Sequence, residues 1–156
     1  MRMLVTGGAG FIGSNIVDAL IARGDNVVVV DDLSTGRESN LDDAIGKGAE
    51  LVRADIRDAD RLAEIVASAQ PDAILHLAAQ IDVRKSVIDP GWDASINVAG
   101  TANVLEAARK AGVARVVNTS TGGAIYGDVE TIPSPESTPP APMAGYGTSK
   151  FCAEQY

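Results

Sequence analysis

Short apolar runs alternate along the chain with segments in which apolar residues recur every three or four positions. The runs predict strands at residues 3–5, 27–30, 49–53, 73–75 and 113–118. The periodic segments predict helices over residues 12–23, 59–69, 91–111 and 146–156. Residues 27–30 are four valines, apolar on both faces, as a buried parallel strand requires. The alternation predicts an α/β fold, a doubly wound parallel sheet with helices on both faces.

Two stretches depart from this pattern. The connection over residues 34–48 has too weak a periodicity to predict a helix. Residues 121–145 carry no periodic apolar signal over 25 positions and hold five of the seven prolines. Such a segment is either a flexible surface loop or a functional lid or binding loop, and its length inside an α/β domain favours the second.

Composition narrows the function classes. The 156 residues suit one domain, and no apolar stretch approaches the length of a membrane span. The net charge is −8, whereas nucleic acids and anionic membranes bind positively charged surfaces, so we expect neither as a partner. One cysteine excludes an intramolecular disulfide and favours the cytoplasm. One histidine and one cysteine are too few for the usual zinc sites, so no metal is expected.

A glycine-rich loop separates the first strand from the first helix. Gly8, Gly10 and Gly13 fit G-x-G-x-x-G, and Gly7, Gly10 and Gly13 fit G-x-x-G-x-x-G. In such loops the glycines allow a tight turn, a close approach of pyrophosphate to the backbone, and packing of helix on strand. Free N–H groups at the helix start then hold the phosphates. The alternative, a glycine-rich turn without a ligand, does not explain the strand before and the helix after.

Acidic residues follow the second and third strands. Asp31 comes directly after the valines, where a carboxylate would bind the adenosine ribose hydroxyls. Asp31 and Asp32 together would repel a 2′-phosphate, which favours NAD over NADP, with Arg37 the one nearby cation against this. Asp32 could equally be a capping or solvated residue. Asp55 could bond the adenine edge, but its spacing alone favours a turn at the strand end.

Tyr146 and Lys150 form a Tyr-x-x-x-Lys pair. Residues i and i+4 share one face of a helix, so the Lys150 ammonium is expected to lower the phenol pKa of Tyr146. A tyrosinate near neutrality is a competent general base. The alternative is a solvated helix turn.

These motifs together resemble the extended short-chain dehydrogenase/reductase superfamily, with its Rossmann fold, and most closely its NAD-dependent nucleotide-sugar 4-epimerases of the UDP-glucose (galactose) type. The resembling stretches follow the order of the family and span nearly the whole chain. They are residues 6–15, 31–36, 76–80, 97–101, 119–127 and 146–150.

The resemblance implies a set of NAD-binding residues. They are Gly7, Gly10, Phe11, Ile12, Gly13, Asp31, Asp32, Ser34, Thr35, Gly36, Asp55, Ile56, Leu77, Ala78, Ala79, Gln80, Asn97, Tyr146 and Lys150. Among them, Asp55 and Ile56 match the adenine contacts, and Asn97 matches a buried helix residue near the nicotinamide. His76 is expected to be a packing residue at a strand end.

The resemblance also implies a catalytic trio of Tyr146, Lys150 and a hydroxyl residue. The hydroxyl is Thr121, which leads into the Gly-Gly turn, or else Ser120. No acid stands at residues 122–125, where dehydratases and decarboxylases of the superfamily place one. A 4-epimerase is therefore the first expectation, and a nucleotide-sugar dehydrogenase or reductase the second. A non-catalytic NAD-binding module is the third.

Members of this family are longer than this chain. We therefore expect residues 1–156 to be the NAD-binding Rossmann domain, truncated before a C-terminal domain that binds the UDP-sugar substrate, with Tyr156 inside a helix. Such a fragment should hold NAD weakly and epimerise poorly or not at all. A homodimer is expected for the full-length enzyme, through the helix after Pro90 and the Tyr-x-x-x-Lys helix. The particular sugar stays open.

Overall fold

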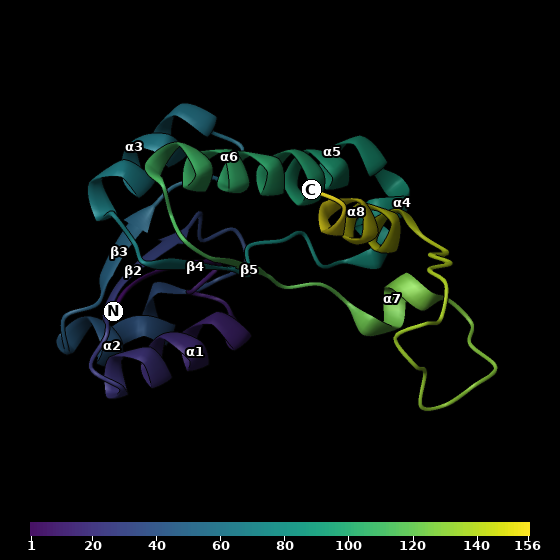
Figure 1. The fold of residues 1–156 in the computed structure, drawn as a ribbon, viewed down its shortest axis with the longest axis horizontal. Helices are drawn as coiled ribbons and strands as arrows, with labels where there is room; N and C mark the ends of the chain where they lie inside the picture. The colour runs from purple at the N-terminus through teal and green to yellow at the C-terminus, as the bar shows by residue number, and fades with distance from the viewer. The chain divides into compact units, whose positions relative to one another are not determined.

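The computed structural model describes residues 1–156 and contains two compact units (Figure 1). The first unit comprises residues 1–79 and 103–119, and the second comprises residues 80–102 and 120–156. Five strands form one sheet in the first unit, and all its pairs are parallel in the order β3-β2-β1-β4-β5. The strands are β1 (Arg2–Thr6), β2 (Asn26–Asp31), β3 (Glu50–Arg53), β4 (Ala73–His76) and β5 (Val116–Asn118). The predicted parallel α/β fold is confirmed.

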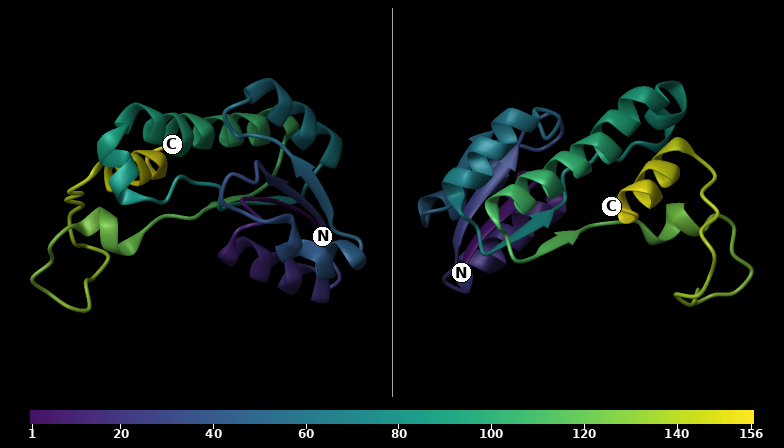
Figure 2. Two further views of the ribbon diagram at one scale, coloured as in Figure 1. Left: turned by 180° about the vertical axis from the view of Figure 1, so that it is seen from behind. Right: turned by 45° about the horizontal axis from the view of Figure 1, so that its top comes forward.

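Helices cover both faces of this sheet, as the alternation predicted. Figure 2 shows α1 (Phe11–Ala22) and α2 (Asp42–Gly46) on one face, with α3 (Ala59–Ala69) and residues 103–111 of α6 (Thr101–Ala111) on the other. The weakly periodic connection after β2 holds only α2 and the short 3₁₀ helix η1 (Glu38–Leu41). Asp58 caps α3 by accepting the Arg61 N–H at 3.0 Å, which confirms the predicted helix start.

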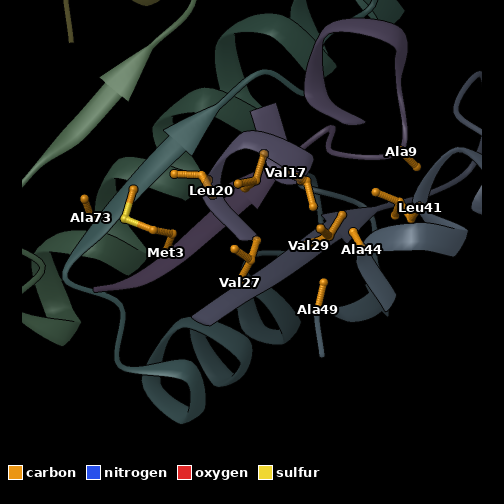
Figure 3. Packing of buried hydrophobic residues seen from close by; sticks show 11 residues of the cluster. Met3, Ala9, Val17, Leu20, Val27, Val29, Leu41, Ala44, Ala49 and Ala73 are labelled. Carbon is orange, nitrogen blue, oxygen red and sulfur yellow. The ribbon is translucent and has the colours of Figure 1, made fainter. Parts of the chain in front are cut away.

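The core of the first unit follows the alternation of strand side chains. Met3 of β1 and Val27 and Val29 of β2 point to the face that α1 and α2 cover (Figure 3), and Val5, the register partner of Val29, belongs to the same cluster. They pack with residues from the two helices and the neighbouring segments: Ala9, Val17, Leu20, Leu41, Ala44, Ala49 and Ala73. Leu4 lies between Met3 and Val5 and is also fully buried, so β1 is apolar on both faces.

The buried face of α1 follows the periodic apolar positions Ile12, Ile16 and Leu20 only in part. Leu20 is buried and Ile16 packs partly buried against the core, with Gly13, Ser14 and Val17 completing the face. Ile12 is 59% exposed. The reason is that Gly13 packs directly on the loop before the helix, which turns the neighbouring Ile12 outward.

The second unit is helical and holds most of the departures from the sequence prediction. Its elements are α4 (Val83–Ile88), α5 (Pro90–Ala94), the π-helical turn η2 (Ser95–Gly100), α7 (Gly122–Tyr126) and α8 (Gly145–Glu154). The predicted helix after Pro90 is therefore the succession α5, η2 and α6, and α4 was not predicted. The predicted loop contains α7, after which the chain makes a long excursion before α8 (Figure 2). Helix α8 ends at Glu154, two residues before Tyr156.

None of the helices combines the length and the apolar character that a membrane crossing demands.

Candidate functional site

The glycine loop lies at the carboxyl edge of the sheet, between β1 and α1. Gly7 has a φ of 71°, which only glycine adopts easily, and its N–H donates to the Val30 carbonyl at 2.8 Å. A Cβ at Gly7 would lie 2.5 Å from the backbone nitrogen of Ala78, in the segment after β4. The loops after β1 and β4 therefore meet where the strand order reverses, which is where doubly wound sheets bind ligands.

The start of α1 offers free backbone donors. Its N-cap residue is Gly10, which supplies no side-chain cap, and the first turn contains no acid. The N–H groups of Phe11, Ile12 and Gly13 thus have no intrahelical acceptor. A Cβ at Gly13 would overlap the Gly7 carbonyl oxygen and lie 2.6 Å from Gly8 Cα. A glycine loop with unpaired donors and no acid in the first turn of the helix fits a pyrophosphate group.

Asp31 sits beside this cradle in a fixed orientation. Its side chain is buried, and its two oxygens accept the N–H groups of Ala9 and Leu33, each at 2.9 Å. Each oxygen keeps a second lone pair for a ligand hydroxyl. Asp32 instead accepts the Ser34 N–H and hydroxyl at 2.9 and 2.6 Å, so the structure gives it the local capping role that was the alternative.

The rest of the loop after β2 returns to the glycine loop between β1 and α1. Thr35 is exposed, while a Cβ at Gly36 would lie 3.0 Å from the Asp31 carboxylate and from Ala9. Asn40, which the sequence did not single out, donates its side-chain amide to the Ala9 carbonyl at 2.7 Å.

Asp55 and Ile56 follow β3 in a turn. The Arg57 guanidinium bonds the Asp55 carboxylate at 2.6–3.1 Å and holds the pKa of that carboxyl below its usual value. Ile56 is buried, and its carbonyl accepts the Asn103 side-chain amide at 3.0 Å. Arg57 and Asn103 were missed, although an arginine two residues after an aspartate was a usable signal for an ion pair.

Leu77, Ala78 and Ala79 follow β4 and run beside Gly7. The Leu77 N–H donates to the Thr6 carbonyl at 3.0 Å, and the Ala78 N–H donates to the Thr6 hydroxyl at 3.3 Å. That hydroxyl also pairs with Nδ1 of His76 at 2.6 Å. His76 is 1% exposed at the end of β4, as expected of a strand-end packing residue.

In the second unit, α8 carries Tyr146 and Lys150. The Tyr146 backbone N–H donates to the hydroxyl of Ser86 on α4 at 2.9 Å, so a residue 60 positions away caps this helix. A Cβ at Gly145 would lie 2.7 Å from the Ser86 carbonyl oxygen, and one at Gly147 would overlap the Ala124 carbonyl oxygen on α7. Glycines thus let α8 pack closely on α4 and α7, which fixes the position of Tyr146.

Several neighbours act on the phenol of Tyr146. Burial is the largest influence and raises its pKa, the Thr121 side chain lowers it, the negative charge of Asp93 raises it more weakly, and the net shift is upward. The expectation that Lys150 lowers this pKa was wrong for the structure as it stands. The two residues share a helix face, but no hydrogen bond joins them, and burial dominates.

Lys150 is only 4% exposed. Burial lowers the pKa of its ammonium, while the negative charges of Glu154 and Asp93 oppose that shift. No carboxylate oxygen lies within 4.0 Å of the Lys150 ammonium nitrogen, so Lys150 forms no ion pair. Lys150 is thus a buried lysine whose pKa is lowered by burial and raised by carboxylates that do not touch it.

The two hydroxyl candidates lie in different surroundings. Thr121 accepts the Ala124 N–H at 3.4 Å as the N-cap of α7, and its side chain also acts on the Tyr146 phenol. The Ser120 hydroxyl oxygen is buried and has no hydrogen-bond partner. Thr121 is therefore the better candidate of the two.

Gln80 and Asn97 pair with each other in the second unit. The Gln80 N–H donates to Asn97 Oδ1, and Asn97 Nδ2 donates to the Gln80 carbonyl, both at 2.9 Å. Both side-chain amides also donate to Asp93, which the sequence did not single out. Because these contacts join residues 13 and 17 positions apart, no local sequence pattern could predict them.

Comparison with known proteins gives one family for this chain. The family model described as "NAD dependent epimerase/dehydratase family" matches residues 3–156. A UDP-glucose 4-epimerase of Mycolicibacterium smegmatis is 51% identical over 100% of this chain and 50% of its own length.

Solved structures give the same family. A UDP-glucose 4-epimerase of Thermus thermophilus in complex with NAD has a TM-score of 0.94 and 46% identity, over 100% of this chain and 49% of its own. One from Thermotoga maritima with UDP-glucose has a TM-score of 0.95 and 43% identity, over 100% of this chain and 50% of its own. This chain spans about half the length of the curated relatives it matches. With a family model matched over nearly its whole length, the chain belongs to the NAD dependent epimerase/dehydratase family.

Proposed function

We propose that this chain forms the cofactor-binding and catalytic part of an NAD-dependent epimerase that inverts C4 of a UDP-sugar, with UDP-glucose and UDP-galactose as the pair. The observation that carries the proposal is the placement of Tyr146 and Lys150 one turn apart on α8, with the Thr121 side chain acting on the phenol. The similar proteins of M. smegmatis and T. thermophilus are both UDP-glucose 4-epimerases. The cytoplasmic location and the homodimer remain predictions.

The first unit supplies the groups that we expect to hold NAD. The N–H groups at the start of α1 would bind the pyrophosphate, and Asp31 would accept the ribose hydroxyls. Asp55, already oriented by Arg57, would face the adenine. Bound NAD would supply the hydride chemistry at C4 of the sugar, by way of a transient 4-keto sugar.

The second unit supplies the proton chemistry. Burial raises the pKa of Tyr146, so the phenolate that takes the proton of the sugar 4-hydroxyl must be stabilised by its neighbours. The Thr121 hydroxyl stabilises the phenolate and can bond the sugar oxygen at the same time. We expect the Lys150 ammonium, one turn away, to stabilise the phenolate further.

The residues around Thr121 also disfavour the other reactions of the family. Elimination from a nucleotide sugar requires an acid beside the reacting carbon. Helix α7, from Gly122 to Tyr126, contains no aspartate or glutamate. This supports inversion over dehydration, since inversion needs only the one proton exchanged at the 4-hydroxyl.

Replacing Tyr146 with phenylalanine tests the proposal. In an active enzyme containing this chain, Tyr146→Phe should slow conversion of UDP-galactose to UDP-glucose by about 10²–10⁴-fold, because the general base is lost. The matched control is Tyr126→Phe, which removes a phenol from α7 and should leave turnover nearly unchanged. Native mass spectrometry should find NAD on both variants. Near-normal turnover by the Tyr146→Phe enzyme would exclude Tyr146 as the base.

A further inference from the structure

Asp93 on α5 is a buried carboxylate without a cation in contact. Its side chain is 0% exposed. Oδ1 accepts the Gln80 amide at 2.8 Å and the Asn97 amide at 3.2 Å, and Oδ2 has no hydrogen-bond partner. Buried carboxylates are normally paired with a positive charge, because burial of an unpaired charge is costly. Two neutral amides compensate a buried negative charge only weakly. The position of Asp93 therefore needs another explanation.

Helix α5 packs against α8, which lies beside it in Figure 1. Asp93 acts electrostatically on both Tyr146 and Lys150 of that helix, and no other charged residue acts on both. Glu154, on α8 itself, raises the pKa of Lys150 more than Asp93 does, but it is exposed.

The remaining elements around α8 contribute no further charge to the pair. Helix α7 and the turn η2 contain no charged residues. On α4, Arg84 is paired with Asp82, and Lys85 stacks over the Trp92 ring at 5.9 Å. Asp93 is thus the one buried charge that faces Tyr146 and Lys150.

We propose that Asp93 is a positioning residue for Tyr146 and Lys150: its buried carboxylate on α5 is the counter-charge of the buried Lys150 side chain on the packed helix α8, while its hydrogen bonds fix Gln80 and Asn97. A buried charge is poorly screened by solvent and salt, so it acts across a gap that a surface carboxylate could not bridge. The catalytic meaning of this arrangement rests on the proposed function, but the electrostatic coupling itself does not.

Asp93→Asn is a clean test, because both amides donate to Oδ1 and the other oxygen has no partner. The amide oxygen of asparagine can keep both hydrogen bonds, and its NH₂ group takes the place of the unbonded Oδ2. The substitution therefore removes the charge and preserves the shape and the contacts.

The readout is the titration of the Lys150 ammonium in the 156-residue chain, followed by NMR of ¹³C-labelled lysine side chains. The other lysines, Lys47, Lys85 and Lys110, serve as internal references. Asp93→Asn should move the Lys150 titration to lower pH by roughly one pH unit, and the move should persist at high salt. The backbone amide spectrum should keep its dispersion.

Glu154→Gln is the matched control, because it removes the exposed carboxylate that also acts on Lys150. Its effect should vanish at high salt, since exposed charges are screened. An unmoved Lys150 titration in Asp93→Asn would overturn the proposal, as would an effect screened like that of Glu154→Gln. An unfolded Asp93→Asn chain would also overturn it, because Asp93 would then be needed for the fold itself. None of these outcomes depends on turnover, so the proposed epimerase function is tested separately.

Discussion

The candidate site of the first unit consists mainly of backbone groups, whereas the candidate site of the second unit consists of buried side chains. In the glycine loop, Gly7 and Gly13 leave room where side chains would stand, and the donors are main-chain N–H groups at the start of α1. Around Tyr146, the positioning groups are the Ser86 hydroxyl, the Thr121 hydroxyl and the Asp93 carboxylate.

Because of this difference, the two sites should tolerate different substitutions. A backbone site depends on empty space, so it is most sensitive to an added atom and indifferent to many side-chain changes. A side-chain site depends on particular hydrogen bonds across helices, so it is most sensitive to a removed atom. The predictions below test that contrast.

Gly13→Ala should have the largest effect on the first unit. Its Cβ would overlap the Gly7 carbonyl oxygen, so the loop must move and the free energy of unfolding should fall by about 1–3 kcal/mol. The displaced loop should weaken NAD binding by at least about tenfold. Urea unfolding and calorimetric titration with NAD measure the two effects.

Gly46→Ala is the control for that substitution. A Cβ at Gly46, at the end of α2, would meet nothing within 4 Å. The change should leave stability unaltered or raise it by up to about 1 kcal/mol, with NAD binding preserved. If Gly13→Ala behaved like Gly46→Ala, the space at Gly13 would not be what shapes the loop.

Ser86→Ala should have a smaller effect, confined to the second unit. The Tyr146 N–H would lose its acceptor, which should lower the free energy of unfolding by about 1–2 kcal/mol. Because Ser86 fixes the first turn of α8, the amide resonances of residues 145–147 should broaden or shift.

Ser95→Ala is the comparison, since the Ser95 hydroxyl only donates to the Trp92 carbonyl of its own helical segment. It should change stability by no more than about 0.5 kcal/mol. Equal losses in the two variants would mean that the bond between α4 and α8 does not hold the helix in place.

The same contrast explains what the sequence could predict. The five strands, the glycine loop, the Asp58 cap and the place of Asp31 follow from patterns within a few residues. Those patterns are local, so the amino-acid order alone carries them. The fold of the first unit was therefore predicted nearly in full, with the exposed Ile12 of α1 the main error.

The second unit was predicted only in part, because its contacts join distant residues. The spacing of Tyr146 and Lys150 placed both on one helix face. It could not show that burial and Asp93 would raise the pKa of Tyr146. Neither the π-helical turn at Asn97 nor the cap from Ser86 has a local signature. These features arise from tertiary packing, which overrides local preference.

Glu106→Gln should have the smallest effect and gives the exposed counterpart of Asp93. Glu106 lies on the surface of α6 in the first unit, bonds Arg109 at 2.8 and 3.0 Å, and lies 3.5 Å from Lys110. The hydrogen bond from Arg109 is the main cause that lowers the pKa of Glu106, to about 2. A lowered folded-state pKa stabilises the fold above the unfolded value of 4.5, and that contribution is lost as the pH falls through about 2. The difference in unfolding free energy between the wild-type and Glu106→Gln chains should therefore shrink across this window.

Because the pair is exposed, high salt should remove most of the difference even at neutral pH. A salt-resistant difference at Glu106, equal to that expected at Asp93, would contradict the distinction between exposed and buried charge on which the contrast of the two units depends.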